Sequence, residues 1–293
     1  MIMKNLLGSN QVWDLSQANK NFRVSQCMKN ENSHSYLSFL RRRNTLKFIR
    51  ITRRFRIDWI PVYVVLILLS TKGFSQVFPV EKETESGFVS IFDGKTLDGW
   101  TGDPVYWRVE NGAMVGEITP ETIVKENTFI IYSQPIEGDF ELKVHFRVSA
   151  EGNSGINYRS ERIKGKPFAL RGYQADIDGK NRWMGQNYEE KGREFLALRG
   201  QITEIEKDGK PKVLGYTGDK EKLISHIKSN DWNEYHLIIR GNVMIHMINK
   251  QIMTMVIDDD VENRKFGGLI GVQVHVGPPM TIEYKKFRIK KLN

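Results

Sequence analysis

The sequence predicts an all-β protein built as a two-sheet β-sandwich. From Phe88 onward, apolar and polar residues alternate with period two, which is typical of strands that have one buried and one exposed face. Few segments have the periodicity of a helix. Of the 293 residues, 40% are hydrophobic and 11% aromatic, which is enough for a sizeable core. Many short strands with little helix favour two packed sheets.

The first element, residues 1–75, is predicted to be an N-terminal extension and a signal peptide. It carries 13 Lys and Arg against 3 Asp and Glu, which leaves 31 of the 44 basic and 32 of the 35 acidic residues for residues 76–293. The net charge of +9 therefore belongs to this segment. The near-neutral remainder gives no electrostatic reason to bind nucleic acid or an anionic membrane.

Three features of this segment indicate export. Arginines and lysines precede a short apolar run at 60–69, and small residues, Gly73 and Ser75, stand at −3 and −1 of a cut before Gln76. The run is shorter than the roughly 20 residues of a membrane-spanning helix. We expect a periplasmic or extracellular protein that meets a membrane only through its leader during export; an uncleaved signal anchor is the alternative.

The mature chain, residues 76–293, is predicted to be one domain. Cys27, the only cysteine, would leave with the leader, so the domain needs neither a disulfide nor a cysteine-based zinc site. Residues 1–40 are either a disordered extension, or the true start of the protein lies within them at Met28.

Strands are predicted in order along this domain. The clearest alternation is at 139–148, where Phe140 and every second residue to Val148 share one face. Three strands joined by tight turns follow at 234–240, 242–249 and 251–256. A last strand at 280–289 closes the domain. A short helix is possible at 218–228, with its first turn near Asp219.

Two polar clusters precede these later strands. In residues 152–159, glycines allow a turn at Asn153, and Arg159 follows one strand further on; a turn with a surface arginine is the plainer interpretation. In residues 172–178, alternation places Gln174, Asp176 and Asp178 on one face. Such a row is either a solvated face or the floor of a polar cleft, and the residues alone favour the solvated face.

Two further stretches carry candidate binding and catalytic groups. Residues 183–193 mix aromatic and acidic side chains, including Trp183, Tyr188 and Glu190, and sugars are held by such mixtures. In residues 271–279, Gln273 and His275 share one face, and the Gly-Pro-Pro that follows could fix the histidine. His145, His236 and His246 sit in ordinary strand patterns, where exposure or hydrogen bonding is expected rather than catalysis, and His226 in the possible helix gives no signal.

The usual enzyme signatures are missing from the sequence. It has no nucleophile elbow, P-loop, dinucleotide glycine motif or His-Glu-x-x-His. The Glu-x-Asp-x-x-Glu strand of sandwich-fold retaining glucanases, which supplies two carboxylates about 5 Å apart, is also absent.

Taken together, the motifs resemble the 3-keto-disaccharide hydrolase family over roughly residues 87–292. The stretches that carry the resemblance are 88–100 (FVSIFDGKTLDGW), 107–112 (WRVENG), 153–156 (NSGI) with Arg159, 174–177 (QADI) with 188–190 (YEE) and Arg193, and 271–280 (GVQVHVGPPM). The resemblance implies a concanavalin A-like or laminin-G-like jelly-roll β-sandwich. It also implies cleavage of 3-keto-glycosides by 1,2-elimination, with hydration of the resulting glycal giving net hydrolysis.

This chemistry assigns hypothetical roles to the clusters. A ketone at C3 acidifies the C2 proton, so a base can remove it while a general acid assists the leaving group at C1. We take His275 as the group that moves this proton, because imidazole titrates near neutral pH. Asp176 and Glu190 are candidates for its acid or base partner, and Arg159 for the donor to the enolate oxygen.

The remaining expectations concern binding. Asn153, Gln174, Gln273, Tyr188 and Trp183 are expected to hold the sugar. No cofactor is certain, but Asp176, Glu190 and His275 would together suit a divalent metal ion. The competing interpretation is a non-catalytic carbohydrate-binding module on the same fold, and a ligand-free structural protein ranks below both. A cleft in which His275, Asp176, Glu190 and Arg159 converge within hydrogen-bond reach would favour the enzyme, whereas four residues scattered over the surface would favour the binding module.

Overall fold

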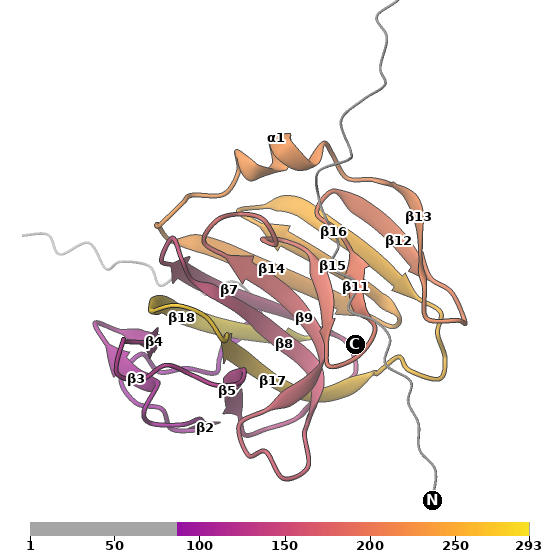
Figure 1. Cartoon of the computed structure of the whole chain (residues 1–293). Helices are drawn as coiled ribbons and strands as arrows, with labels where there is room; N and C mark the ends of the chain where they lie inside the picture. The colour runs from indigo at the N-terminus through magenta and orange to yellow at the C-terminus, as the bar shows by residue number, and fades with distance from the viewer. Residues whose placement is uncertain (1–86, 293) are drawn as a thin grey trace, which may run out of the picture. The chain divides into compact units, whose positions relative to one another are not determined.

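The computed structural model describes residues 87–292. Within these residues the chain forms two sheets and one short helix (Figure 1), which confirms the predicted all-β jelly-roll β-sandwich. The predicted leader, the cleavage site after Ser75 and Cys27 lie outside the described residues, so they stay predictions.

The larger sheet has ten strands. They are β1 (Val89–Ser90), β3 (Trp107–Glu110), β4 (Ala113–Ile118), β7 (Phe140–Val148), β12 (Gln201–Ile205), β13 (Pro211–Tyr216), β14 (Asn233–Arg240), β15 (Val243–Ile248), β16 (Gln251–Asp258) and β18 (Met280–Lys291). Their spatial order is β13-β12-β16-β15-β14-β7-β18-β4-β3, with β1 paired to β18. Neighbouring strands of this sheet run antiparallel, except β12 and β16, which run parallel.

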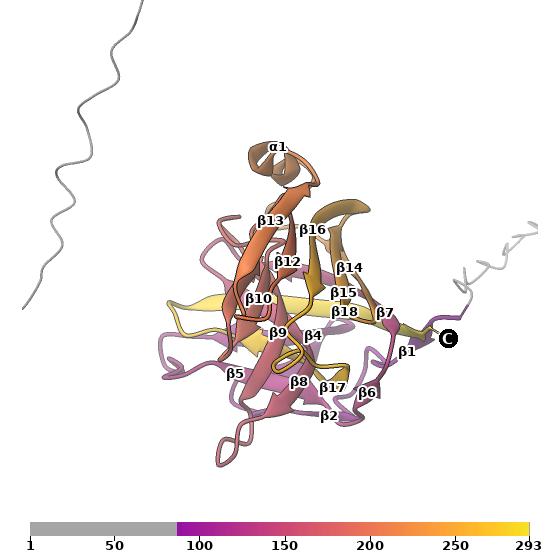
Figure 2. The ribbon, with the colours of Figure 1, turned by 90° about the vertical axis from the view of Figure 1, so that its right-hand side faces the viewer.

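The smaller sheet has eight strands. They are β2 (Trp100–Thr101), β5 (Thr128–Tyr132), β6 (Ile136–Glu137), β8 (Asn153–Arg162), β9 (Leu170–Asp178), β10 (Asn187–Glu190), β11 (Glu194–Ala197) and β17 (Gly267–Val274). Their order is β11-β10-β9-β8-β17-β5-β2, with β6 paired to β17. The side view in Figure 2 shows β14, β15 and β16 on one side and β5, β9 and β10 on the other.

The core lies between the two sheets, and the alternation of buried and half-buried residues is clearest in the larger sheet. In β7, every second residue from Phe140 to Val148 is buried, as the sequence predicts, and the residues between them are half-buried. In the smaller sheet, Ile156, Tyr158 and Tyr173 point into the same core. Burial of such side chains contributes roughly 1.5–3 kcal/mol each, which makes this layer the main source of stability.

The helix α1 (Lys220–Ile224) confirms the predicted helical turn, and it lies outside the sheets at the top of Figure 1. The carboxylate of Asp219 caps it by accepting from the backbone amides of Glu221 and Lys222. Leu223 is its buried residue. No helix among residues 87–292 is long and apolar enough to cross a membrane.

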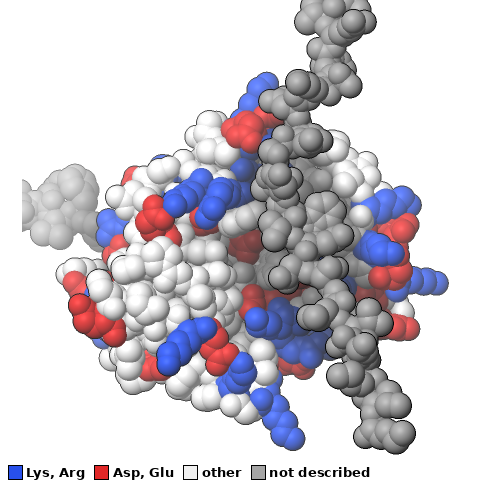
Figure 3. All heavy atoms as spheres, in the orientation of Figure 1, with Lys and Arg blue, Asp and Glu red and all other residues white. Residues whose placement is uncertain are grey.

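The surface of this domain mixes charges of both signs. On the face seen in Figure 3, Lys and Arg side chains lie among Asp and Glu side chains rather than in a single-sign patch. This distribution agrees with the near-neutral composition of residues 76–293 and offers no extended basic track on that face.

Candidate active site

The polar clusters of the sequence meet on the outer face of the smaller sheet, because its strand register places them in successive rows. Asp176 on β9 pairs with Gly155 on β8, and Gln174 pairs with Tyr188 on β10. Glu190 lies opposite Gly172, two rows beyond Asp176. At the other end, the backbone amide of His275 donates to Asn153 O, one row before Gly155. The rows are about 7 Å apart.

A cavity of about 500 Å³ opens over these rows. Of the predicted site residues it is lined by His275, Asp176, Glu190, Asn153, Gln174, Tyr188 and Trp183. Its other lining residues are Asn127, Lys191, Gly192, Glu194 and Phe195. Three of the four residues predicted to be catalytic therefore share one pocket of the size that binds small ligands.

The floor of the cavity is a chain of hydrogen bonds that ends on Asp176. The amide of Gln273 donates from Nε2 to Gln174 Oε1 (3.3 Å), and Gln174 donates from Nε2 to Asp176 Oδ1 (2.8 Å). Gly155 leaves the room for this chain, because a Cβ there would lie 2.5 Å from Gln174 Cδ. Gln273, predicted to hold the sugar, is itself fully buried and contacts Gln174 instead.

The polar row on β9 is buried, so the solvated face favoured by the sequence is wrong. Asp176 is only 7% exposed and Gln174 4%. Burial raises the pKa of Asp176 to about 8, against the lowering effect of the Gln174 hydrogen bond, and the charges of Glu190 and Asp178 raise it further. This carboxyl group is therefore protonated at neutral pH and can donate a proton.

Glu190 is held at the rim by contacts from distant parts of the chain. Asn127 donates from Nδ2 to Glu190 Oε1 (3.2 Å), and Asn127 Oδ1 accepts from the backbone amide of Val276 (3.0 Å). Lys191 Nζ lies 3.9 Å from the same carboxylate. Asn127 thus ties Glu190 to the segment that carries His275.

The imidazole of His275 has a defined tautomer when neutral. Its Nδ1 lies 2.6 Å from Val276 O, and a carbonyl oxygen only accepts, so Nδ1 carries the hydrogen. Nε2 is then free to accept a proton, as a general base requires. Three other histidines of residues 87–292 are hydrogen-bonded through their side chains, as expected: His145 to Glu234, His236 to Glu141, and His246 to Tyr158.

One wall of the cavity is aromatic. Trp183 stacks on Phe195 with centroids 5.4 Å apart, and Tyr188 meets Phe195 edge to face at 5.0 Å. Trp183 is 39% exposed and Phe195 36%, so part of each ring is open to a ligand. Asp178 fixes the turn that leads to Trp183, because its Oδ2 accepts from the backbone amides of Arg182 and Trp183.

Arg159 does not join the cavity, which corrects its predicted place beside the enolate oxygen. The register between β8 and β9 shifts after Tyr158, and Arg159 adopts φ 45° at this bulge, so simple alternation fails. The side chain is 2% exposed and donates to Gly241 O (2.7 Å) and Gly138 O (3.2 Å). Both acceptors lie in turns that lead into or out of strands of the larger sheet, so Arg159 ties the two sheets together.

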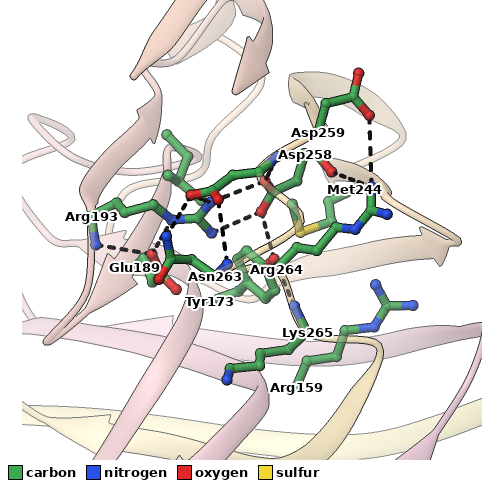
Figure 4. Close-up of polar contacts among 12 residues, drawn as sticks. Arg159, Tyr173, Glu189, Arg193, Met244, Asp258, Asp259, Asn263, Arg264 and Lys265 are labelled. Atoms are coloured by element: carbon green, nitrogen blue, oxygen red, sulfur yellow. Dashed lines mark hydrogen bonds and ion pairs between the residues drawn. The ribbon is translucent and has the colours of Figure 1, made fainter. Parts of the chain in front are cut away.

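A buried ion-pair network supports the turn between β10 and β11, which directly follows Glu190. Arg193 contacts Glu189 (2.6 Å), both oxygens of Asp258 (3.0 and 2.8 Å) and Asp260 (3.1 Å), as Figure 4 shows for Glu189 and Asp258. Tyr173 donates its hydroxyl to Asp258 at 2.6 Å. The turn is thereby anchored to the end of β16.

The predicted metal ligands do not form a metal-binding group. Among residues 87–292, no three or more His, Cys, Asp or Glu side chains are grouped to hold a metal ion, so Asp176, Glu190 and His275 line one cavity without forming such a set. The hydrogen bonds from Gln174 to Asp176 and from Asn127 to Glu190 occupy one oxygen of each carboxylate instead.

Sequence reasoning missed Asn127 and Phe195. Asn127 lies 63 residues from Glu190 and 149 from Val276, and no local pattern signals such contacts. Phe195 could have been found, because it is a further aromatic residue that follows closely on Trp183 and Tyr188 in the sequence.

Comparison with known proteins finds one family match and one curated relative, and their names describe related activities. The sequence model of the 3-keto-alpha-glucoside-1,2-lyase-like domain matches residues 87–290. A 3-keto-disaccharide hydrolase of Bacteroides thetaiotaomicron is 26% identical over 180 residues, which cover 50% of this chain and 61% of that protein.

Solved structures with a similar chain trace include a carbohydrate binding module from Bacillus subtilis, at 15% identity and a TM-score of 0.43, which covers 66% of this chain and 96% of the module. Another is a Bacillus subtilis protein of unknown function with a galectin-like fold, at 10% identity and a TM-score of 0.44, with coverage of 67% and 90%.

Proposed function

The chain belongs to the 3-keto-alpha-glucoside-1,2-lyase-like domain family, and from that premise we propose that it cleaves 3-keto-glycosides by 1,2-elimination. One observation carries the proposal: His275, Asp176 and Glu190 line a single cavity that is also lined by the aromatic rings of Trp183, Tyr188 and Phe195. The relative named a 3-keto-disaccharide hydrolase supports a carbohydrate-active hydrolase-like enzyme, and hydration of the glycal would complete net hydrolysis.

The elimination needs a base and an acid, and the cavity offers both. Nε2 of His275 takes the C2 proton, which the C3 ketone acidifies. The electron pair of that C–H bond forms the C1–C2 double bond as the C1–O bond breaks. The leaving oxygen takes the proton of the Asp176 carboxyl group, which burial keeps protonated at neutral pH. The products are an enone of glycal type and a free alcohol.

Other groups of the cavity bind and orient the sugar in this proposal. Asn153 and Lys191 supply hydrogen-bond donors to the ketone and hydroxyl oxygens, in place of the buried Arg159. Trp183, Phe195 and Tyr188 cover the C–H face of a sugar ring. Gln174 fixes Asp176 Oδ1, so Oδ2 is the oxygen left to carry the transferred proton.

The deciding experiment incubates the purified protein with a 3-keto-glucoside and with the unoxidised glucoside. We expect the 3-keto compound alone to be cleaved, and mass spectrometry and NMR to detect the glycal enone, the free 3-keto-sugar or both. Binding without cleavage would favour the second candidate, a carbohydrate-binding module, for which the exposed aromatic wall is the specific support. Cleavage of the unoxidised glucoside would contradict elimination through the ketone.

The alkaline side of the pH profile tests the acid. Because Asp176 must hold a proton, and its pKa is raised to about 8, we expect kcat/KM to fall as pH rises through about 8. Initial rates on a 3-keto-glucoside between pH 5 and pH 10 check this. Undiminished activity well above that pH would contradict the assignment of Asp176 as the acid.

The aromatic wall is tested by Phe195→Ala, which removes the ring that both Trp183 and Tyr188 contact. We expect KM for the 3-keto-glucoside to rise about tenfold with little change in kcat, because aromatic contacts of this kind contribute roughly 0.5–1.5 kcal/mol beyond area burial. The matched control is Tyr216→Ala, an exposed aromatic residue on the edge strand β13, which should leave KM unchanged. Equal effects of both variants would count against the wall.

A further inference from the structure

The loop between β9 and β10, residues 179–186, contains no helix or strand, yet it carries Trp183 of the aromatic wall. Each backbone carbonyl oxygen from 181 to 186 accepts a hydrogen bond. The side chains that donate from outside the loop are those of Arg199, Thr254 and His246, and all three are buried. Irregular loops usually open at low cost in free energy, so this loop is unusually well held.

Arg199 supplies the largest share of this support. Its Nη1 donates to Asn181 O (2.9 Å) and Met184 O (2.7 Å), on either side of Trp183. Its Nε donates to Lys220 O (3.1 Å), at the first residue of α1. A planar guanidinium group can serve two segments at once in this way, and a lysine ammonium group cannot. Arg199 therefore joins the loop to the helix that lies outside the sheets.

Groups of opposite charge hold the two kinds of polar group in the loop backbone. Asp178 accepts from the amides of Lys180 (3.2 Å), Arg182 (2.6 Å) and Trp183 (3.1 Å), whereas Arg199 donates to carbonyl oxygens. Burial lowers the pKa of Arg199, and the carboxylates of Glu221 and Asp178 oppose this effect. The backbone around Trp183 is thus fixed through its donors and its acceptors.

The larger sheet adds support from across the core. His246 on β15 and Thr254 on β16 are cross-strand neighbours, and both are fully buried. Thr254 Oγ1 donates to Gly185 O (3.3 Å), and His246 Nδ1 lies 3.3 Å from Gln186 O. Burial lowers the pKa of His246 to about 3, so its ring stays neutral above that pH and its contact does not change near neutral pH.

We propose that Arg199 is a positioning residue for the sugar: it fixes the 179–186 loop so that the Trp183 ring is already in place when the substrate binds. A wall that is fixed beforehand spares the substrate the cost of ordering a loop. The inference rests on the proposed function, which it extends from the groups that touch the sugar to the group that holds one of them.

The test measures kcat and KM of Arg199→Lys on a 3-keto-glucoside. Lysine keeps the positive charge, but its single nitrogen cannot replace the three contacts of the guanidinium group. We expect KM to rise about fivefold and kcat to change by less than about twofold, because a misplaced ring weakens binding without touching the proton transfers. A fall in kcat with unchanged KM would contradict a role in positioning the sugar.

A double-mutant cycle shows whether Arg199 acts through Trp183. Trp183→Ala should raise KM by itself, and Arg199→Lys added to it should raise KM no further. Additive effects on KM would overturn the proposal. The matched control is Arg159→Lys, another buried arginine that donates to backbone carbonyls but lies outside the cavity. It should leave KM unchanged, and a rise equal to that of Arg199→Lys would also overturn the proposal.

Two further arms keep the test decisive. If Arg199→Lys does not fold, Thr254→Val removes the donor to Gly185 O at nearly the same shape. We expect it to raise KM about twofold, because a neutral hydrogen bond contributes less than a charged one, and to lose this effect beside Trp183→Ala. If the wild type binds the 3-keto-glucoside without cleaving it, the proposed function fails alone, and the same cycle in the dissociation constant from calorimetry decides the role of Arg199. A wild type that does not bind the compound overturns both.

Discussion

Asp176→Asn is expected to lower kcat on a 3-keto-glucoside by roughly 10²–10⁴-fold, the contribution of a positioned general acid. The substitution is isosteric, and its amide oxygen can still accept from Gln174 Nε2, so the floor of the cavity should persist. The alkaline fall in rate should disappear with the titrating group. Asp208→Asn, an exposed residue of the turn between β12 and β13, is the control and should keep full activity.

The same substitution is expected to stabilise the protein. Lower activity together with higher stability would separate a catalytic role of Asp176 from a structural one. The pKa of Asp176 is raised from 3.8 to about 8 in the folded state. Between these values the unfolded chain releases a proton that the native protein keeps, so the wild type loses stability as pH rises through this window. Asparagine has no proton to release. We expect the free energy of unfolding of Asp176→Asn at pH 7 to exceed that of the wild type by on the order of a few kcal/mol.

Urea unfolding of both proteins at pH 4 and pH 7 measures this effect. The difference should be small at pH 4 and larger at pH 7. A variant that keeps wild-type kcat, or one that is less stable than the wild type at pH 7, would show that the buried carboxyl group does not serve as the acid proposed here.

Arg193→Met is expected to destabilise the protein by about 3–5 kcal/mol, because it leaves buried carboxylates without their cation. Asp258 and Asp260 are almost fully buried, and Arg193 contacts both. The loss should appear as a lower urea midpoint. Lys210→Met, which breaks the exposed pair with Asp208, is the matched control and should change stability by less than about 1 kcal/mol.

A double variant distinguishes the ion pair from simple packing. If the carboxylate of Asp258 is the main uncompensated charge, Asp258→Asn added to Arg193→Met should recover part of the lost stability. Additive losses from the two single changes would mean that the pair is not coupled and that Arg193 acts through the volume it fills.

The strands and the contents of the cavity could be predicted because both follow from alternation along single strands. The period-two pattern of 139–148 placed Phe140 and its partners in the core, and the same rule put Gln174 with Asp176 and Gln273 with His275. A strand sequence alone does not say which of its faces is covered, so the burial of the polar row on β9 was not predictable. That depends on the neighbours that the sheet register supplies.

Two errors in the predicted site have local causes. Arg159 was misplaced because a bulge after Tyr158 breaks alternation, and nothing in the run Tyr158-Arg159-Ser160 announces a positive φ at arginine. Asn127 was missed because its partners are brought to it by pairing between β5 and β17, far apart in the chain. Contacts of this kind exist only once the sheet has assembled.

The bridge made by Asn127 also has a consequence for how activity is acquired during folding. Its side chain joins Glu190, 63 residues away, to Val276, 149 residues away. Closing loops of this length is entropically costly, and non-local pairings of this kind slow the folding of β proteins. The proposed catalytic groups therefore meet only after the late strand β17 has docked, and we expect regain of activity on refolding to report completion of the whole sandwich rather than of any one hairpin.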